Sequence, residues 1–409
     1  MAGNRGLALA AAAGLLLRLA FGLAYWVAEP LTRDEREYLS LARSLAAGRG
    51  FVYDEALRAG GPVDPFDRAP GYPAFLALVG GGGAVTDVVP TSVKIAQAIV
   101  GACGVLLVGS LTRRLADARS ATIAAWIAAC YPPLVAVSAR AFSEALFWPI
   151  GLAAAALLSG AGRGAASRAM SAAALGGIVA GLATLVRPGT IVFVAMGALW
   201  LLWRRWPART LAFALGAALV LAPWIVRDYQ RDGRLVLVAS AGGVNFWAGN
   251  HPLAVGDGDL AANPDLKRAN QALKAAHPDL TEAQMEPVYY REARAWMRAH
   301  PVDWLVLEIR KLFYLVAPVG PSYRLHSWRY YVASAGPYLL VLPAAIVGAW
   351  RLGTARRRMP GLWLLAGSAV VTALIFFPQE RYRIPVIDPV LIVCAGAAWA
   401  AGRDATDLA

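Results

Sequence analysis

The sequence has few charged residues for its length. Only 16% of its 409 residues are Asp, Glu, Lys or Arg, and 58% are hydrophobic, whereas soluble domains carry about 25% charged residues. Because so much apolar surface cannot be covered in water, the composition excludes an ordinary soluble enzyme. The length instead allows about ten membrane spans with connecting loops.

Cysteine and histidine are also scarce. The three cysteines, Cys103, Cys130 and Cys394, each lie inside an apolar run without Cys-x-x-Cys spacing. We therefore expect buried thiols, with no disulfide and no structural zinc. The four histidines all lie in the region 251–326 without metal-ligand spacing, so no metal site of that kind is predicted.

Lysine is rare among the basic residues, although the net charge is +13. Only four of the 39 basic residues are lysines, and the arginines punctuate apolar runs. They form no stripe interleaved with aromatic residues of the kind that binds nucleic acid. This pattern is typical of arginines at membrane edges, and no nucleic-acid partner is predicted.

Ten apolar runs are long enough, or nearly long enough, to cross a membrane. They lie at 7–29, 92–111, 120–138, 143–160, 170–187, 189–203, 209–226, 331–350, 361–377 and 384–401. The short loops at 113–119, 163–168, 204–209 and 351–358 are rich in arginine, which places them in the cytoplasm by the positive-inside rule. The long loops 30–91 and 227–330 then lie outside, provided that 72–79 and 303–317 do not cross.

The predicted fold class is an all-α polytopic membrane protein with about ten transmembrane helices and two large extracytoplasmic loops that carry interfacial helices. We expect an N-terminal module at 1–226 that contains the first loop, 30–91. A cap with an interfacial helix follows at 227–330, and C-terminal membrane helices occupy 331–409. The amphipathic pattern of 303–317 suits a helix that lies in the interface.

The first long loop opens with a cluster of acidic residues. Asp34 and Glu35 begin a segment in which Tyr38, Leu41 and Leu45 recur at helical spacing, which predicts an amphipathic helix on the membrane surface. A carboxylate there suits a general base that takes a proton from a hydroxyl group. Helix capping is the alternative interpretation of both residues.

Several short motifs resemble those of membrane glycosyltransferases of the GT-C fold, which include protein O-mannosyltransferases and the aminoarabinose transferases that modify lipid A. The resemblance begins with Asp34-Glu35-x-x-Tyr38 and continues in order along most of the chain. The further motifs are Gly48-x-Gly50-Phe51, Arg68-x-Pro70-Gly71-Tyr72-Pro73, Ser143-Glu144-x-x-Phe147, Arg187-Pro188, Pro223-Trp224-x-x-Arg227-Asp228-Tyr229, Gly242-Gly243-x-Asn245, Gly249-Asn250-x-Pro252 and Arg381-Tyr382-Arg383-x-Pro385.

The resemblance implies that a sugar passes from a polyprenyl phosphate to an acceptor outside the cytoplasm, with inversion at the anomeric carbon. It also assigns the general base to Asp34, with Glu35 beside it. The family often has Asn where this chain has Asp228, so the role of Asp228 stays open. The implied partners are the lipid-linked donor, a glycan, lipid or protein acceptor, and membrane lipids.

The reaction itself requires cations near the leaving phosphate, which guanidinium groups stabilise through charge-assisted hydrogen bonds. Arginines at the outer ends of spans suit this task, although each of them also suits an anchoring role at the membrane edge. Glu144 begins a span beside Arg140, where a salt bridge or a favourable charge at the helix N-terminus is the alternative to a role in the site. The predicted substrate-binding residues are Arg68, Tyr72, Glu144, Arg187, Arg227, Asn245, Asn250, Lys311, Arg381, Tyr382 and Arg383.

Three points stay open in the sequence. A divalent cation near Asp34 and Glu35 is compatible with the acidic cluster, although no cofactor is clearly indicated. A multi-span transporter or a non-catalytic lipid-binding or assembly subunit of the cell envelope also fits the composition. We expect the protein in the cytoplasmic (inner) membrane, with its site on the extracytoplasmic side.

Overall fold

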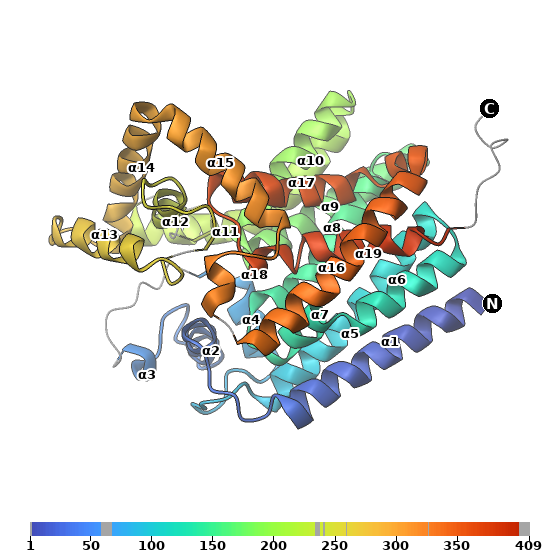
Figure 1. The fold of residues 1–409 in the computed structure, drawn as a ribbon, viewed down its shortest axis with the longest axis horizontal. Coiled ribbons are helices and arrows are strands. Elements are labelled where there is room, and N and C mark those ends of the chain that lie inside the picture. Colours follow the sequence, from blue (N-terminus) through green and yellow to red (C-terminus); the bar gives the residue numbers. More distant parts are fainter. Residues whose placement is uncertain are drawn as a thin grey trace.

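The computed structural model describes residues 2–58, 68–233, 238–239, 242–258, 260–325 and 327–400. These residues form helices and loops, and none of them lies in a strand. His326, one of the four histidines, lies outside them. Long helices pack side by side over most of the molecule, while α2 and α3 (residues 33–58) and α12 to α14 (residues 242–299) gather at the end away from the N-terminus of α1 (Figure 1).

Each of the ten predicted apolar runs corresponds to a helix or a pair of helices. Asn4–Tyr25, α5, α8, α9, α11 and α16 are long and apolar enough to cross a membrane, and the broken pair α6 and α7 bends by 56°. α10 with the turn before it, α17 and α19 are shorter apolar helices. The chain is a multi-pass membrane protein, and the number of helices that cross stays a prediction. The bounds of these elements are α1 (Ala2–Ala20) with its π-helical end (Phe21–Tyr25), α5 (Thr91–Leu115), α6 (Ala118–Cys130), α7 (Pro132–Ala136), α8 (Ser143–Gly160), α9 (Ala166–Val186), α10 (Ile191–Trp203), α11 (Pro207–Asp232), α16 (Trp328–Arg351), α17 (Pro360–Ile375) and α19 (Ile387–Ala397).

Glycine lets α9 and α11 pack with their backbones in close contact. A Cβ atom at Gly177 would lie 2.0 Å from the carbonyl oxygen of Phe213, and one at Gly216 would lie 2.4 Å from that of Ala174. Small residues allow this approach between apolar helices. The contact fixes the end of α9, where Arg187 begins the turn that leads to α10.

The arginine-rich turns meet at one end of the helix bundle. Arg163 follows α8, and burial together with the charges of Arg358 and Arg114 lowers its pKa. Arg113, at the end of α5, donates a hydrogen bond of 2.6 Å to Asn4 near the start of α1. Arginines from several short loops therefore share one face, as the positive-inside pattern requires, and the compartment that they face stays a prediction.

Shorter helices build the opposite end. The ring of Tyr38 on α2 meets the ring of Tyr72 on α4 edge to face at 4.9 Å, and α12 packs against α14. α4 and α15, which the sequence predicts not to cross, are 8 and 16 residues long, so α4 is far too short for ~30 Å of hydrocarbon. The bounds are α2 (Arg33–Ala46), α3 (Glu55–Arg58), α4 (Gly71–Leu78), α12 (Gly242–Gly249), α13 (Pro264–Ala275), α14 (Glu282–Ala299), α15 (Pro301–Val316) and α18 (Glu380–Arg383).

Candidate active site

Asp34 lies in the first turn of α2 and is held by two arginines. Its Oδ1 accepts a hydrogen bond of 2.6 Å from Nη2 of Arg68, and its Oδ2 accepts one of 2.6 Å from Nη1 of Arg381. Arg68 belongs to the same loop as Asp34, whereas Arg381 comes from α18 near the end of the chain. The side chain of Asp34 is 24% exposed. The carboxylate therefore has a defined direction and a charged partner on each oxygen.

The two arginines keep Asp34 ionised. Burial favours the neutral form of the carboxyl group, but the charges and hydrogen bonds of Arg381 and Arg68 outweigh burial and lower the pKa of Asp34 far below its usual range. An opposite charge at hydrogen-bonding distance favours the ionised form of an acid. Asp34 is thus an anion at any physiological pH in this arrangement.

Glu35 caps the N-terminus of α2 instead. Its Oε2 accepts hydrogen bonds from the backbone nitrogen and the hydroxyl of Thr32, at 2.9 and 2.8 Å, while Thr32 Oγ1 accepts one from the backbone nitrogen of Glu35. This reciprocal arrangement is a capping box. The other oxygen, Oε1, accepts a hydrogen bond of 3.0 Å from the backbone nitrogen of Ala141. The capping interpretation therefore describes Glu35 in this structure.

The oxygens of Asp34 and Glu35 leave no evident place for a divalent cation. Each of the four carboxylate oxygens already accepts a hydrogen bond from the protein, and a cation would have to displace arginines to reach Asp34. Within the described part of the chain, no group of three or more His, Cys, Asp or Glu residues is arranged to hold a metal ion. This donor set does not fit the cation that the sequence left open.

Glu37 is a member of the cluster that the sequence did not indicate. Its Oε2 accepts a hydrogen bond of 2.7 Å from Nε of Arg68, and its Oε1 accepts one of 2.9 Å from Arg33. Arg68 also lies 5.1 Å from the centre of the Tyr38 ring. Asp34 and Glu37 are three residues apart and so share one face of α2, a signal that could have identified Glu37.

Glu144 pairs with two of the predicted phosphate-binding arginines. Its side chain is buried, and its Oε1 lies 2.9 Å from Nη1 of Arg187 and 3.1 Å from Nε of Arg381. The alternative partner, Arg140, instead lies over the rings of Trp26 and Phe142 at 5.0 and 5.3 Å. Glu144 therefore connects the turn after α9 to α18, and both arginines are held by one carboxylate.

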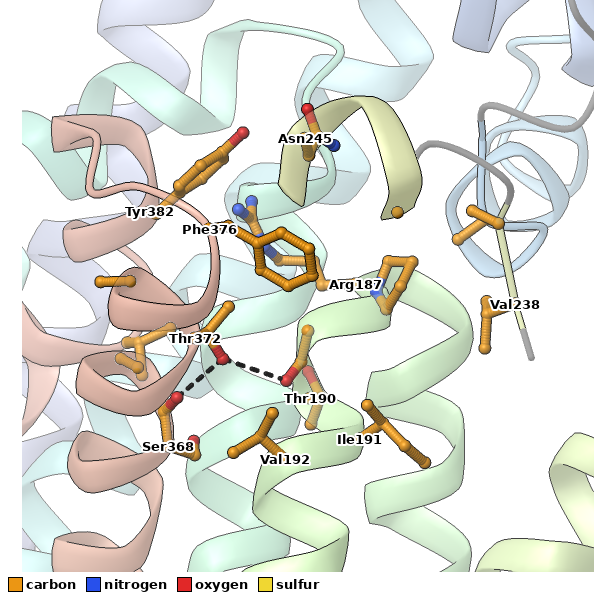
Figure 2. Close-up of a pocket in the computed structure, with 18 of the residues that line it drawn as sticks. Arg187, Thr190, Ile191, Val192, Val238, Asn245, Ser368, Thr372, Phe376 and Tyr382 are labelled. Carbon is orange, nitrogen blue, oxygen red and sulfur yellow. Dashed lines mark hydrogen bonds between the residues drawn. The ribbon is translucent and has the colours of Figure 1, made fainter. Parts of the chain in front are cut away.

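A cavity of about 1060 Å³ opens next to these arginines. Arg68, Arg187, Arg381, Tyr38 and Tyr382 line its polar end. Figure 2 shows Tyr382, Arg187 and Asn245 at one end of the cavity, and Ile191, Val192 and Ser368 at the other. The wall at that end comes mainly from the start of α10 and from α17. Its apolar residues are Ile191, Val192, Leu365, Ala369, Ala373 and, directly after α17, Phe376, and its polar residues are Thr190, Ser368 and Thr372. One cavity thus joins a cationic end to a region between two apolar helices.

The cap supplies the wall above the arginines. Asn245 on α12 lines the cavity together with Glu286, Tyr290 and Arg294 of α14. The three α14 residues are spaced four apart and therefore lie on one face of the helix. The sequence singled out Asn245 but not these three residues, although their spacing is visible in it. Glu286 accepts a hydrogen bond of 3.2 Å from the backbone nitrogen of Gly243, which attaches α14 to α12.

Other predicted binding residues make contacts within the protein. Lys311 is fully buried and donates hydrogen bonds to Asn250 (3.3 Å), Glu308 (2.7 Å) and the carbonyl oxygen of Leu374 (2.8 Å). Asn250 in turn donates to the carbonyl oxygens of Phe246 and Ile375, both at 2.9 Å. Lys311 and Asn250 are outside the set of residues that line the large cavity.

Three further candidates also have partners within the protein. The Tyr72 hydroxyl donates a hydrogen bond of 2.7 Å to Gln97. Arg227 donates one of 2.7 Å to Asp228 and lies 4.3 Å from the Trp224 ring, so the Asp at position 228 is an ion-pair partner of its neighbour. Arg383 is buried, with Nε 3.0 Å from Asp388 and its guanidinium 3.6 Å from the Tyr338 ring.

Comparisons with known proteins agree with the resemblance drawn from the motifs. Residues 67–226 match the model of the dolichyl-phosphate-mannose-protein mannosyltransferase family. A comparison with curated proteins gives no match. The family match over residues 67–226 and the structural matches to an archaeal enzyme described next confirm the resemblance to the GT-C fold.

The matching solved structures include an archaeal oligosaccharyltransferase, AglB from Archaeoglobus fulgidus, in complex with an inhibitory peptide and a dolichol-phosphate. That match has a TM-score of 0.53 at 15% identity and covers 97% of this chain and 50% of AglB. The apo form of the A. fulgidus enzyme matches with a TM-score of 0.55 at 16% identity and the same coverage. ArnT from Cupriavidus metallidurans bound to undecaprenyl phosphate matches with a TM-score of 0.46 at 14% identity, over 96% of this chain and 77% of ArnT. The chain thus spans about half the length of the archaeal enzyme and shares its fold.

Proposed function

We propose that the protein transfers a sugar from a polyprenyl-phosphate donor to an acceptor outside the cytoplasm, with Asp34 as the general base. The observation that carries this proposal is the shape of the large cavity. Apolar residues of α10 and α17 line one end, and four arginines line the cavity, of which Arg68 and Arg381 hold Asp34. A lipid with an anionic headgroup matches this cavity, because its chain would lie at the apolar end and its headgroup at the arginines.

The donor phosphate would lie at Arg187 and Arg381. Both guanidinium groups line the cavity where its apolar wall ends, and an arginine can form bidentate hydrogen bonds to a phosphate. The archaeal match was solved with a dolichol-phosphate, which supports a lipid phosphate as the ligand class. The sugar would then extend toward the cap, where Asn245 and Tyr382 line the cavity.

The chemical step follows from this placement. The acceptor hydroxyl attacks the anomeric carbon from the side opposite the phosphate, and its proton passes to the Asp34 carboxylate. The bond between the anomeric carbon and the phosphate oxygen breaks as the new bond forms, which inverts the configuration at that carbon. Arg187 and Arg381 stabilise the charge that develops on the leaving phosphate.

Several predicted residues support the site in our proposal without touching substrate. Glu35 holds the start of α2, and Glu144 positions Arg187 and Arg381. Tyr72, Asn250, Lys311 and Arg383 keep neighbouring elements together through the contacts described above, whereas the contacts described for Arg227 lie within α11. Arg68 orients Asp34 because it also pairs with Glu37.

Asp34→Asn tests the proposal. The variant keeps the shape of the side chain but cannot accept a proton, and general-base assistance contributes about 10²–10⁴-fold. Sugar transfer from a panel of synthetic undecaprenyl-phosphate sugars to envelope extracts should fall by that factor, while donor binding persists. Asp54→Asn is the matched control, because Asp54 lies in the same loop but pairs with Arg43 instead.

The outcomes separate the classes of function. Transfer at the wild-type rate by Asp34→Asn would refute the catalytic role of Asp34. A lipid-binding or assembly subunit would bind the donors but would transfer no sugar, whether as the wild-type protein or as either variant. A transporter would move the lipid-linked sugar across vesicles without changing it.

A further inference from the structure

We propose that Arg381 is the shared counter-ion of the catalytic base and the leaving phosphate, so that Asp34 and the phosphate compete for one guanidinium group. This inference rests on the proposed function and adds a link between two of its steps. It accounts for the direct contact between Asp34, the proposed base, and Arg381, which we propose binds the phosphate.

The atoms of Arg381 are divided between the protein and the cavity. Nη1 donates to Oδ2 of Asp34 at 2.6 Å, and Nε donates to Oε1 of Glu144 at 3.1 Å. The hydrogen bonds of Arg381 to residues in the described ranges use Nε and Nη1 and not Nη2. The side chain is 35% exposed and lines the cavity. One edge of the guanidinium group therefore holds the base, and the remaining nitrogen is available to a ligand.

Asp34 contacts two arginines of the cavity wall but is not itself part of that wall. Arg68 and Arg381 line the cavity, whereas Asp34 is outside the set of lining residues. A phosphate beside Arg381 would thus share this guanidinium group with Asp34. Both ligands are anions, so the carboxylate beside Arg381 repels the phosphate and offsets part of the attraction of the guanidinium group.

The charges of the arginines and carboxylates around Arg381 give a reason why the base and the phosphate would share it. Arg68, Arg187 and Arg381 are balanced by Asp34, Glu37 and Glu144, which are joined to them by ion pairs. In the transfer step the donor phosphate goes from one negative charge to two, because it receives the electron pair of the broken bond. Asp34 goes from one negative charge to none, because it receives the acceptor proton.

The total charge at the site therefore stays constant during the reaction. A negative charge disappears on one side of Arg381 as another appears on the other side. Arg381 can turn from a partner of Asp34 into a partner of the phosphate without any new cation entering the site. Preorganised charges of this kind stabilise a transition state with little reorganisation.

Binding of the product tests this coupling without any need for turnover. Undecaprenyl phosphate is titrated into the purified wild-type protein, Asp34→Asn, Arg381→Gln and the double variant. Asp34→Asn should bind it about tenfold more tightly than wild type, within the usual range of coupling between sites, because Arg381 no longer pairs with a carboxylate. In the Arg381→Gln background, the same change at Asp34 should bring no gain in affinity.

Glu37→Gln is the matched control for charge. It removes one negative charge from the same cluster, but Glu37 pairs with Arg68 and Arg33 rather than with Arg381. Its gain in product affinity should be much smaller than that of Asp34→Asn. Asp34→Ser serves as a second variant, with thermal unfolding as the check that each protein is folded.

Two results would overturn the inference. One is unchanged product affinity in both folded Asp34 variants, and the other is an equal gain whether or not Arg381 is present. These results differ from failure of the proposed function, in which Asp34→Asn retains sugar transfer. Loss of transfer with unchanged product affinity would leave Asp34 as the base and remove Arg381 as its shared partner.

Discussion

Asp34 and Arg381 are 347 positions apart in the sequence and are joined by a hydrogen bond of 2.6 Å. The acid comes from the first turn of α2, and the arginine comes from the four-residue helix α18. The bond brings the first loop and the C-terminal helices together at the cavity. The chemistry that we propose depends on this long-range pair, so the predictions below begin with it.

The pH dependence of transfer should report the pair directly. A base must be ionised, so activity is lost as the pH falls through its pKa. Arg381 and Arg68 lower the pKa of Asp34 against the opposing effect of burial, and Arg381→Gln removes part of that lowering. The acid limb of kcat/KM should therefore move to higher pH in Arg381→Gln, even though the plateau rate also falls.

The groups around Asp34 define the control for this measurement. Arg68 and Arg381 contact its carboxylate, and Arg68 also forms an ion pair with Glu37. Arg187→Gln also removes a cavity arginine, but Arg187 pairs with Glu144 and not with Asp34. Its acid limb should stay near that of wild type. Equal shifts in both variants would show that the limb belongs to another group.

Glu35 should contribute to stability more than to chemistry. Glu35→Ala removes the capping box of α2 and leaves the buried backbone nitrogen of Ala141 without its partner. Loss of a cap costs about 0.5–2 kcal/mol, and an unsatisfied buried donor costs about 1–3 kcal/mol. Thermal unfolding should show the loss, while turnover per folded molecule should change far less than in Asp34→Asn. Inactivity of a fully folded Glu35→Gln would return the catalytic role to Glu35.

Arg187 and Arg383 should behave differently although both stand at the outer ends of predicted spans. Arg383 is buried against Asp388 and Tyr338, and breaking a buried pair costs about 3–5 kcal/mol. Arg383→Ala should therefore lower the folded yield and the unfolding temperature. Arg187→Ala should fold more nearly as wild type but bind undecaprenyl phosphate more weakly, by about 2–5 kcal/mol if the contact is poorly hydrated. Undiminished lipid binding by Arg187→Ala would remove it from the proposed phosphate site.

Cysteine labelling should establish which side of the membrane the site faces. Cys103 and Cys130 are exposed in the structure, so the expectation of buried thiols was wrong for these two and holds for Cys394. In a background without Cys103 and Cys130, a cysteine at Asn263 should react with a membrane-impermeant reagent in intact cells. A cysteine at Arg163 should not react until the cells are opened. The reverse pattern would place the cavity arginines in the cytoplasm and contradict the proposed orientation.

The helices were predictable because hydropathy is a local property of the chain. The run at 143–160 coincides with α8 (Ser143–Gly160), and Asp34 and Arg381 were both among the predicted site residues. The pairing was not predictable, because it depends on how distant helix ends meet. Arg381 and Arg383 are two residues apart, yet one lines the cavity and the other is buried against Asp388.

Lys311 is a second case in which the sequence does not reveal the partners of a side chain. A lysine on an amphipathic helix suits a lipid phosphate, and the sequence contains no sign that Asn250, Glu308 and the carbonyl of Leu374 take up its hydrogen bonds. The contact with Leu374 depends on where α17 ends relative to α15. Only the packed structure supplies that relation.

The late position of α18 has a consequence for how the protein is made. A chain emerging from the ribosome inserts the first loop with its acid early, and the arginine that completes the pair follows more than 300 residues later. During most of translation the acid has no such partner, and the end of the cavity that we propose binds the phosphate lacks one of its walls. A nascent or prematurely terminated chain would therefore be inert toward lipid-linked sugars, and activity would appear only when the final helices are in place.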